Sequence, residues 1–211
     1  MTPSTPWPAP RRPLVAILRG VAPHEIEGIA EALVEAGFEA LEVPLNSPDP
    51  FRSITLARKL APAGCLVGAG TVLEPAEVDR LHGAGGNLVV SPNVEPAVIA
   101  RATTLGMVTM PGVFTITEAF TALKAGASAL KFFPASVLGP SGIRALRAVL
   151  PAGTVVGAVG GVSETDFAEY VAAGTGAFGL GSSLYKPGYT AAEVGARARA
   201  AVAAWDALSR G

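Results

Sequence analysis

The sequence has little of the chemistry that builds disulfides and metal sites. It contains one cysteine, Cys65, so no disulfide can form within the chain, and the apolar run around it favours a buried thiol over a reactive one. The two histidines, His24 and His82, lie far apart and lack the paired spacing of metal ligands, and no motif demands a carboxylate-bound Mg²⁺. We therefore expect a protein of a reducing cytoplasm that uses no metal or other cofactor.

Charge and long apolar runs are also scarce. Charged residues make up 16% of the 211 residues, the formal net charge is -1, and no run of lysines and arginines occurs. This excludes the usual electrostatic signature of proteins that bind nucleic acid or anionic membranes. No stretch of 18 uninterrupted apolar residues is present, and the segment before Arg11 lacks the apolar region of a signal peptide. Small molecules are the expected partners.

Glycine and proline, in contrast, are plentiful, at 25 and 18 residues, and half of the chain is hydrophobic. This composition is typical of a globular α/β protein. Residues 1–13 are rich in proline and predict a loosely ordered N-terminal arm. The alternative is that this arm packs beneath the domain that follows it. No linker or change of composition divides residues 14–211, which we expect to form one domain.

One local pattern recurs along the chain. A helical segment ends in small residues and glycine, and an apolar run follows at once, as in EAGFEALEV, GAGGNLVV, KAGASALKF and AAGTGAFGL. Glycine supplies the left-handed conformation that ends a helix, and short apolar runs suit strands buried on both faces. Proline and acidic residues in SPDP, EPAE, VEPA, ITEA and SETD indicate where helices begin. The pattern predicts alternating helices and parallel strands.

Eight such strands are predicted, with helices between them. Their ranges are 14–19, 39–45, 65–70, 87–91, 106–110, 128–133, 154–160 and 176–181. Parallel strands of this kind form either an open doubly wound sheet or a closed barrel. The count of eight, without a GxGxxG opening, favours a single (β/α)8 TIM barrel.

Two charged residues in the middle of predicted strands stand out, Glu42 in ALEVPL and Lys131 in ALKFFP. The two-residue period of a strand turns Glu42 and Lys131 toward the barrel interior, because their neighbours must pack against the helices. The other three lysines have ordinary positions: Lys59 on a charged helix face, Lys124 in a last helical turn, and Lys186 in a loop. A buried structural ion pair is the alternative interpretation, but such pairs contribute little stability. A desolvated lysine beside a carboxylate favours attack on a carbonyl, with the carboxylate relaying protons.

Glycine-rich segments end the last two strands. AVGGV, which contains Gly160 and Gly161, and GLGSS, which contains Gly181 and Ser182, lie where these barrels bind phosphate. Either segment could instead be a tight turn. The hydroxyl of Ser163 or Ser182 could assist binding. Arg19 closes the first strand, beside the eighth in a closed barrel, and could add a cation for phosphate or carboxylate; a surface position is the alternative.

Eight motifs, in order, carry a family resemblance: PLVAILRG, EALEVPLNSP, VGAGTV, VSPN, MPG, ALKFFPAS, AVGGV and GLGSSLY. Over residues 13–206 the chain resembles the 2-keto-3-deoxy-6-phosphogluconate and 6-phosphogalactonate aldolases. The resemblance implies a class I, Schiff-base aldolase on a (β/α)8 barrel. It also implies a homotrimer that cleaves a 2-keto-3-deoxy-6-phospho sugar acid to pyruvate and glyceraldehyde 3-phosphate.

The resemblance also implies roles for individual residues. Lys131 would form the Schiff base and Glu42 would donate and accept protons. Thr71 would contact the carboxylate derived from pyruvate, and Arg19 would bind substrate. The remaining substrate-binding positions, including those expected at the phosphate, are Asn46, Val159, Gly160, Gly161, Gly181 and Ser182.

Two positions concern the substrate's configuration at C4. The gluconate branch resembles LEVTLRT and PTGG, whereas this chain has LEVPLNS and AVGG, so Asn46 replaces an arginine and Val159 a threonine. A site that lacks a hydroxyl loses a hydrogen bond to one C4 epimer. We therefore expect 2-dehydro-3-deoxy-6-phosphogalactonate as substrate, with the gluconate epimer, or both epimers, as the alternative.

Two other functions fit the same scaffold. A metal-free phosphosugar isomerase would use Glu42 as base and Lys131 as electrophile, and would form no imine that borohydride can trap. A non-catalytic barrel would bind a phosphorylated ligand, with little dependence on Lys131.

Overall fold

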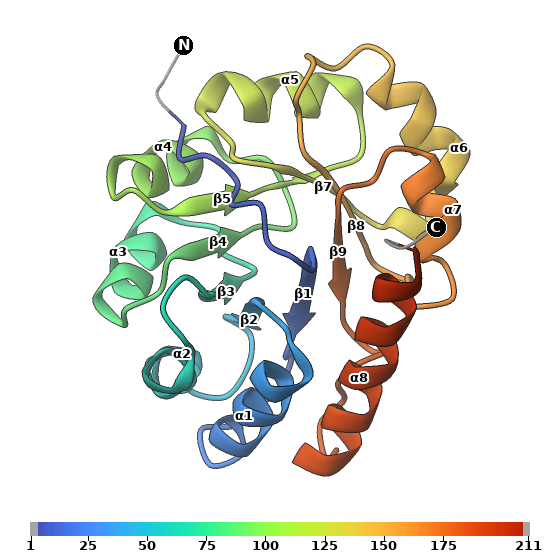
Figure 1. The fold of residues 1–211 in the computed structure, drawn as a ribbon. Helices are drawn as coiled ribbons and strands as arrows, with labels where there is room; N and C mark the ends of the chain where they lie inside the picture. The colour runs from blue at the N-terminus through green and yellow to red at the C-terminus, as the bar shows by residue number, and fades with distance from the viewer. Residues whose placement is uncertain (1–3, 209–211) are drawn as a thin grey trace.

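The computed structural model describes residues 4–208, so the outer ends of the predicted arm and of the predicted barrel segment, residues 1–3 and 209–211, lie outside the described residues. Strands alternate with helices, and a ring of helices surrounds the strands (Figure 1). The strands are β1 (Leu14–Ile17), β2 (Ala40–Pro44), β3 (Leu66–Gly70), β4 (Leu88–Val90), β5 (Val108–Met110), β6 (Gly112–Val113), β7 (Leu130–Phe132), β8 (Val156–Val159) and β9 (Ala177–Leu180). The helices are α1 (Ile26–Ala36), α2 (Pro50–Leu60), α3 (Pro75–Gly83), α4 (Pro96–Thr104), α5 (Ile116–Ala125), α6 (Ala135–Arg147), α7 (Phe167–Ala172) and α8 (Ala191–Leu208).

The strands form a closed parallel barrel. Their order is β5-β4-β3-β2-β1-β9-β8-β7-β6, and β5 and β6 are separated in sequence by Pro111 alone. Hydrogen bonds close the ring, because the N–H of Ala129 donates to the carbonyl of Thr109 (3.1 Å) and that of Lys131 donates to Pro111 (2.9 Å). The predicted (β/α)8 barrel is confirmed, and the open sheet is wrong.

One strand differs from its prediction. The fifth barrel position is split into β5 and β6, whereas a single strand over 106–110 was predicted. β5 pairs with β4 and β6 pairs with β7, so the chain changes partner at Pro111. Proline has no N–H to continue a ladder, which explains the break at this residue.

Helix starts follow the predicted signals. Pro50, Pro75 and Pro96 each occupy a first helical position, where the missing N–H costs nothing. At α5, Thr115 and Glu118 form a reciprocal capping box. Because the loops before α2, α3, α4 and α5 are short, each of these helices follows closely on the strand before it.

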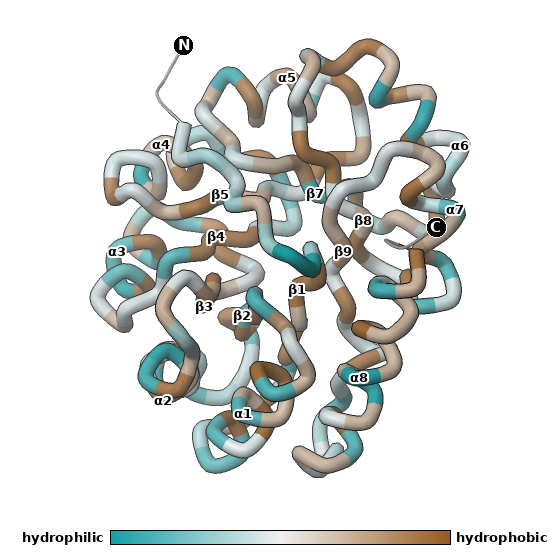
Figure 2. The backbone as a smooth tube through the Cα atoms, viewed as in Figure 1, coloured by the Kyte–Doolittle hydropathy of each residue, from teal (hydrophilic) through white to brown (hydrophobic). Residues whose placement is uncertain are grey.

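The barrel interior is filled at its amino-terminal end. A hydrophobic cluster there consists of Val15, Ala40, Leu66, Leu88, Val90, Val108, Met110, Ala129 and Ala177. A larger cluster lies between strands and helices, and Figure 2 shows hydrophobic colour concentrated on the strands and alternating along the helices. The inner cluster closes one end of the barrel, so space for a ligand remains at the carboxyl ends of the strands.

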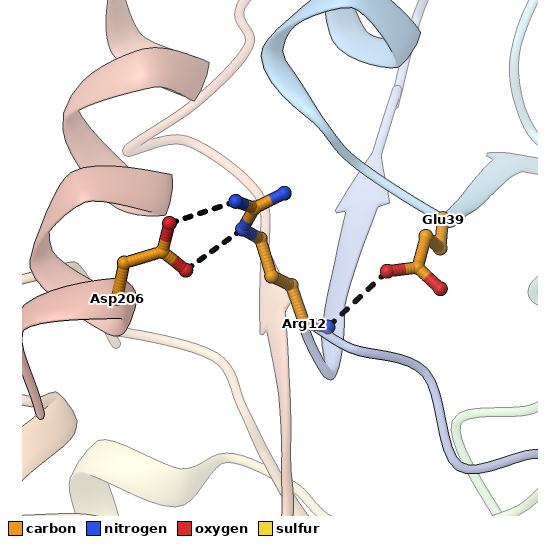
Figure 3. A network of polar contacts seen from close by, with 3 residues as sticks. All are labelled: Arg12, Glu39 and Asp206. Carbon is orange, nitrogen blue, oxygen red and sulfur yellow. Dashed lines mark hydrogen bonds and ion pairs between the residues drawn. The ribbon is translucent and has the colours of Figure 1, made fainter. Parts of the chain in front are cut away.

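The N-terminal segment contacts the closed end of the barrel. Residues 4–13 contain no helix or strand, and Trp7 packs against the inner cluster. The guanidinium of Arg12 donates two hydrogen bonds to Asp206 in α8 (2.8 and 2.7 Å), and its backbone N–H donates to Glu39 (3.3 Å; Figure 3). These contacts join the N-terminal segment to α8 and to the residue before β2. The division of the chain after residue 13 stays a prediction.

Candidate active site

A cavity of about 350 Å³ opens at the carboxyl ends of the strands. It is lined by Ile17, Arg19, Glu42, Thr71, Pro92, Lys131, Phe133, Val159, Gly160, Gly161, Val162, Gly179, Gly181, Ser182, Tyr185, Lys186 and Pro187. Both charged strand residues predicted to point inward are in this set. Of the predicted substrate-binding residues, only Asn46 is outside it.

The position of the two charged residues follows from the strand period. Glu42 lies two residues beyond Ala40, and Lys131 two residues beyond Ala129, and both alanines belong to the inner cluster. Residues two apart on a strand face the same way, so the carboxylate and the amine lie in the layer directly above that cluster. Glu42 is 3% exposed and Lys131 is 7% exposed. The inner cluster shields both groups from water on one side, and the cavity reaches them from the other.

Burial changes the protonation of this pair. Desolvation raises the pKa of Glu42 to about 7, against the opposing attraction of Lys131 and Arg19. Desolvation lowers the pKa of Lys131 to about 8, an effect reduced by Glu42 and reinforced by Arg19. A proton can therefore leave either group near neutral pH, which is what nucleophilic attack and proton relay require.

Gly70, at the end of β3, makes room for the carboxylate. A β-carbon there would collide with Oε2 of Glu42. That oxygen is buried and has no hydrogen-bond partner among the described residues. A buried carboxylate oxygen without a partner disfavours the charged form, in line with the raised pKa of Glu42.

Gly70→Ala tests this packing. We expect the added methyl group to displace the carboxylate, lowering kcat by about 100-fold, because misplacing a catalytic group by about 1 Å costs this much. We also expect the free energy of unfolding to fall by about 1–3 kcal/mol. Steady-state kinetics and urea denaturation measure both quantities.

Gly83→Ala is the matched control. Gly83 ends α3, and an added β-carbon there meets no atom within 4 Å. Helix propensity predicts a gain of about 0.5–1 kcal/mol and unchanged kinetics. If Gly70→Ala behaves like this control, Gly70 has no role in placing Glu42.

Phe133, the residue directly after β7, covers the amine of Lys131. Its ring centroid lies 4.7 Å from Nζ of Lys131, which precedes Phe133 by two residues in the sequence. An aromatic face stabilises an ammonium or an iminium cation. Phe133 was missed from the sequence as a site residue, although the strand period places it on the same face as Lys131.

Glycine-rich turns follow β8 and β9. Gly160 and Gly161 have φ angles of 91° and 71°, values that residues with a β-carbon rarely adopt. After β9 the carbonyl of Gly181 accepts the N–H groups of Leu184 and Tyr185, forming a turn whose first N–H groups have no partner within it. These two turns line one side of the cavity and suit an anion such as phosphate.

Of the two serines that the sequence suggests for phosphate binding, only Ser182 lies in the cavity wall beside the glycine-rich turns. Ser182 lines the cavity, whereas Ser163 lies outside the lining. The Ser163 hydroxyl lies 2.9 Å from the Asp166 carboxylate and 2.8 Å from the Thr165 hydroxyl. Ser163 therefore belongs to the turn that precedes α7.

Thr71 has an unusual backbone. Its φ angle is 58°, in the left-handed region, which is rare for a β-branched residue. It lines the cavity directly after β3. Strain of this kind is concentrated at functional sites.

Three cavity residues come from the segment after β9, which sequence patterns did not place in the site. Lys186, predicted to lie in an unremarkable loop, lines the cavity together with Tyr185 and Pro187. This segment packs closely against Gly20, where an added β-carbon would lie 2.8 Å from Cγ of Pro187. Tyr185 is 3% exposed, and burial raises the pKa of its phenol to about 12. The sequence Gly-Ser-Ser-Leu-Tyr-Lys-Pro contains no pattern that predicts the return of this segment to the cavity.

Residues 4–208 contain neither a cluster of metal-ligating side chains nor a membrane-spanning helix. No three His, Cys, Asp or Glu side chains among residues 4–208 come together as a metal site would. Within the same residues, no helix combines the length and apolarity needed to cross a membrane. Cys65 is buried, as predicted.

Comparisons with known proteins show which family this chain resembles. The profile of the family described as KDPG and KHG aldolase matches residues 10–204. A relative from Rhizobium meliloti (strain 1021), named probable 2-dehydro-3-deoxy-6-phosphogalactonate aldolase, is 66% identical over 206 residues, which cover 98% of this chain and 97% of the relative. The 2-dehydro-3-deoxy-6-phosphogalactonate aldolase of Escherichia coli (strain K12) is 48% identical over 92% of this chain and 94% of its own length.

The fold agrees equally well. A solved structure described as native KDPGal superimposes with a TM-score of 0.94 and 45% identity, covering 98% of this chain and all of the other. By contrast, the 2-dehydro-3-deoxy-phosphogluconate aldolase of Treponema pallidum (strain Nichols) is 36% identical over 68% of each chain. The chain belongs to the KDPG and KHG aldolase family, and it is a class I aldolase, a carbon–carbon lyase.

Proposed function

We propose that this aldolase cleaves 2-dehydro-3-deoxy-6-phosphogalactonate to pyruvate and D-glyceraldehyde 3-phosphate. The observation that carries the proposal is the buried amine of Lys131, which shares one cavity with Glu42 and with the glycine turns after β8 and β9. The substrate is the one named for the two galactonate relatives. Family membership favours this reaction over the isomerase and the non-catalytic binding barrel.

The reaction begins with imine formation. The neutral amine of Lys131 adds to the C2 carbonyl carbon of the substrate to give a carbinolamine. The carbinolamine takes up one proton from solvent and loses water, which gives a protonated imine. The lowered pKa of Lys131 provides the neutral amine near pH 8. Thr71 and Arg19 lie on the cavity wall where they can bind anionic groups of the substrate, and the two glycine turns hold the phosphate.

Carbon–carbon cleavage follows from this imine. The carboxylate of Glu42 accepts the proton of the C4 hydroxyl, the C3–C4 bond breaks, and its electron pair moves into the imine to give an enamine. Glyceraldehyde 3-phosphate leaves. The Glu42 acid then returns a proton to C3, and water hydrolyses the new imine to pyruvate and free Lys131. In the cleavage step, the protonated imine accepts the electron pair of the C3–C4 bond.

Val159 supports the choice of C4 epimer. It is 5% exposed and lines the cavity at the end of β8, so its side chain offers no hydroxyl to the substrate at this position. A site built around such a hydrogen bond discriminates against a ligand that cannot make it, and an apolar wall removes that preference.

Steady-state cleavage of both epimers by one preparation tests the proposal. We expect kcat/KM to be at least about tenfold higher for the galactonate epimer, the size of one differential contact. Val159→Thr should narrow this ratio. A preference for the gluconate epimer would reverse the substrate assignment while leaving the aldolase chemistry intact.

The assembly and the compartment are proposals of the same kind. We propose a homotrimer in the cytoplasm. The loops after β3 and β6 expose Leu73 and Phe114, at 43% and 40%, and the first turn of α6 exposes Val137, at 72%. Exposed apolar residues of this kind are often covered by a partner subunit. A single buried thiol suits a reducing compartment. Light scattering of the purified protein measures the number of subunits.

A further inference from the structure

Asn46 contacts a cavity residue without lining the cavity itself. Its side-chain oxygen accepts a hydrogen bond of 2.6 Å from Nη1 of Arg19, and Arg19 is part of the cavity wall. The two residues follow β1 and β2, which are adjacent in the barrel, with Ile17 paired to Glu42. Both side chains are exposed, so this bond is the constraint that the structure gives to the guanidinium.

Arg19 lines the same cavity as the reacting pair and the glycine turn after β9. Its positive charge lowers the pKa values of both Glu42 and Lys131. On its other side, β1 pairs with β9, and the residue after Arg19 approaches Pro187. A guanidinium at this point can reach an anionic group at either end of the substrate.

We infer that Asn46 is a positioning residue, whose amide oxygen holds the Arg19 guanidinium in the cavity mouth so that it binds an anionic group of the substrate. The inference rests on the proposed function and deepens it. A long, exposed arginine loses conformational freedom when it binds an anion, and a fixed hydrogen-bond acceptor removes part of that cost in advance. Asn46 thus acts through Arg19 and has no contact with the substrate.

Kinetics in the condensation direction test this role. Asn46→Leu keeps the size of the side chain and removes the acceptor, whereas Asn46→Asp keeps an acceptor. We expect Asn46→Leu to raise one KM about tenfold, the size of a charge-assisted hydrogen bond, with kcat within about threefold of the wild-type value. A raised KM for glyceraldehyde 3-phosphate identifies the phosphate as the anion, and a raised KM for pyruvate identifies the carboxylate. Asn46→Asp should return the affected KM to within about threefold.

Asn93→Leu is the matched control. Asn93 is exposed after β4 and does not line the cavity. The same chemical change on the same side of the barrel should leave both KM values unaltered. An unchanged KM in Asn46→Leu as well would overturn the inference.

A double-mutant cycle separates positioning from direct contact. If Asn46 acts through Arg19, then Asn46→Leu has no further effect in an Arg19→Ala background. Additive losses would show that Asn46 acts independently, which contradicts the inference. Should the proposed substrate be wrong, wild-type enzyme would condense pyruvate and glyceraldehyde 3-phosphate mainly to the gluconate epimer, whatever Asn46→Leu does to the KM values, so the two failures are distinguishable.

The pH profile gives a second readout. The ionisable side chains that line the cavity are Arg19, Glu42, Lys131, Tyr185 and Lys186. Because Arg19 lowers the pKa of both Glu42 and Lys131, releasing it should move both inflections of the pH–rate profile to higher pH. A purely structural role for Asn46 would leave those inflections in place.

Discussion

Lys131→Ala should lower kcat by about 10⁴-fold or more while the protein remains folded. The amine is the group to which the substrate carbon becomes attached, and without it no imine can receive the electrons of the C3–C4 bond. The side chain is 7% exposed in a cavity, so its truncation leaves space that water can enter from the open end. Cleavage measured by coupled detection of pyruvate, together with circular dichroism, gives both quantities.

Lys59→Ala provides the comparison for this experiment. Lys59 lies in the last turn of α2, away from the cavity, and its removal should leave kcat unchanged. Residual activity of Lys131→Ala within tenfold of wild type would mean that another group forms the covalent intermediate. Lys186 is the structural rival, since it also lines the cavity, although its side chain is exposed.

Glu42→Gln should lower kcat by about 10²–10⁴-fold, the usual contribution of a positioned acid–base group. Glutamine keeps the shape that fits beside Gly70 but cannot accept the C4 hydroxyl proton. The imine between Lys131 and pyruvate should still form, because Glu42 is assigned to the later proton transfers. Loss of imine formation together with cleavage would instead give Glu42 a role in attack on the carbonyl.

The pH dependence should follow from the same pair. Burial raises the pKa of Glu42 to about 7, so the carboxylate that accepts the proton is populated above this pH. Burial lowers the pKa of Lys131 to about 8, so the neutral amine is populated above that value. We therefore expect kcat/KM to rise between about pH 6 and pH 9, and Glu42→Gln to remove the lower inflection. A profile that falls over this range would contradict the assigned protonation states.

Much of this site was predictable because strands have a strict period. Alternation alone placed Glu42 and Lys131 in the interior, and glycine after a helix marked the beginning of most strands. The predicted strand ranges contain all of the observed strands except β6, from β1 at Leu14–Ile17 to β9 at Ala177–Leu180. These features depend on local backbone geometry, which a sequence pattern reports directly.

What was missed depends on contacts between distant segments. The break at Pro111 follows from a change of partner strand, and Lys186 reaches the cavity because its loop folds back toward Gly20. Asn46 was predicted to bind substrate, yet it lies outside the cavity and contacts Arg19. None of these contacts leaves a periodic trace in the sequence, so only the three-dimensional structure reveals them.

Reduction with borohydride in the presence of pyruvate, followed by peptide mass spectrometry, tests the central claim most directly. The sequence offers four lysines, Lys59, Lys124, Lys131 and Lys186, and each would give a distinct modified peptide. We predict one adduct per chain, on Lys131, and none in Lys131→Ala. An adduct on Lys186, or the absence of any adduct from active wild-type enzyme, would contradict the account.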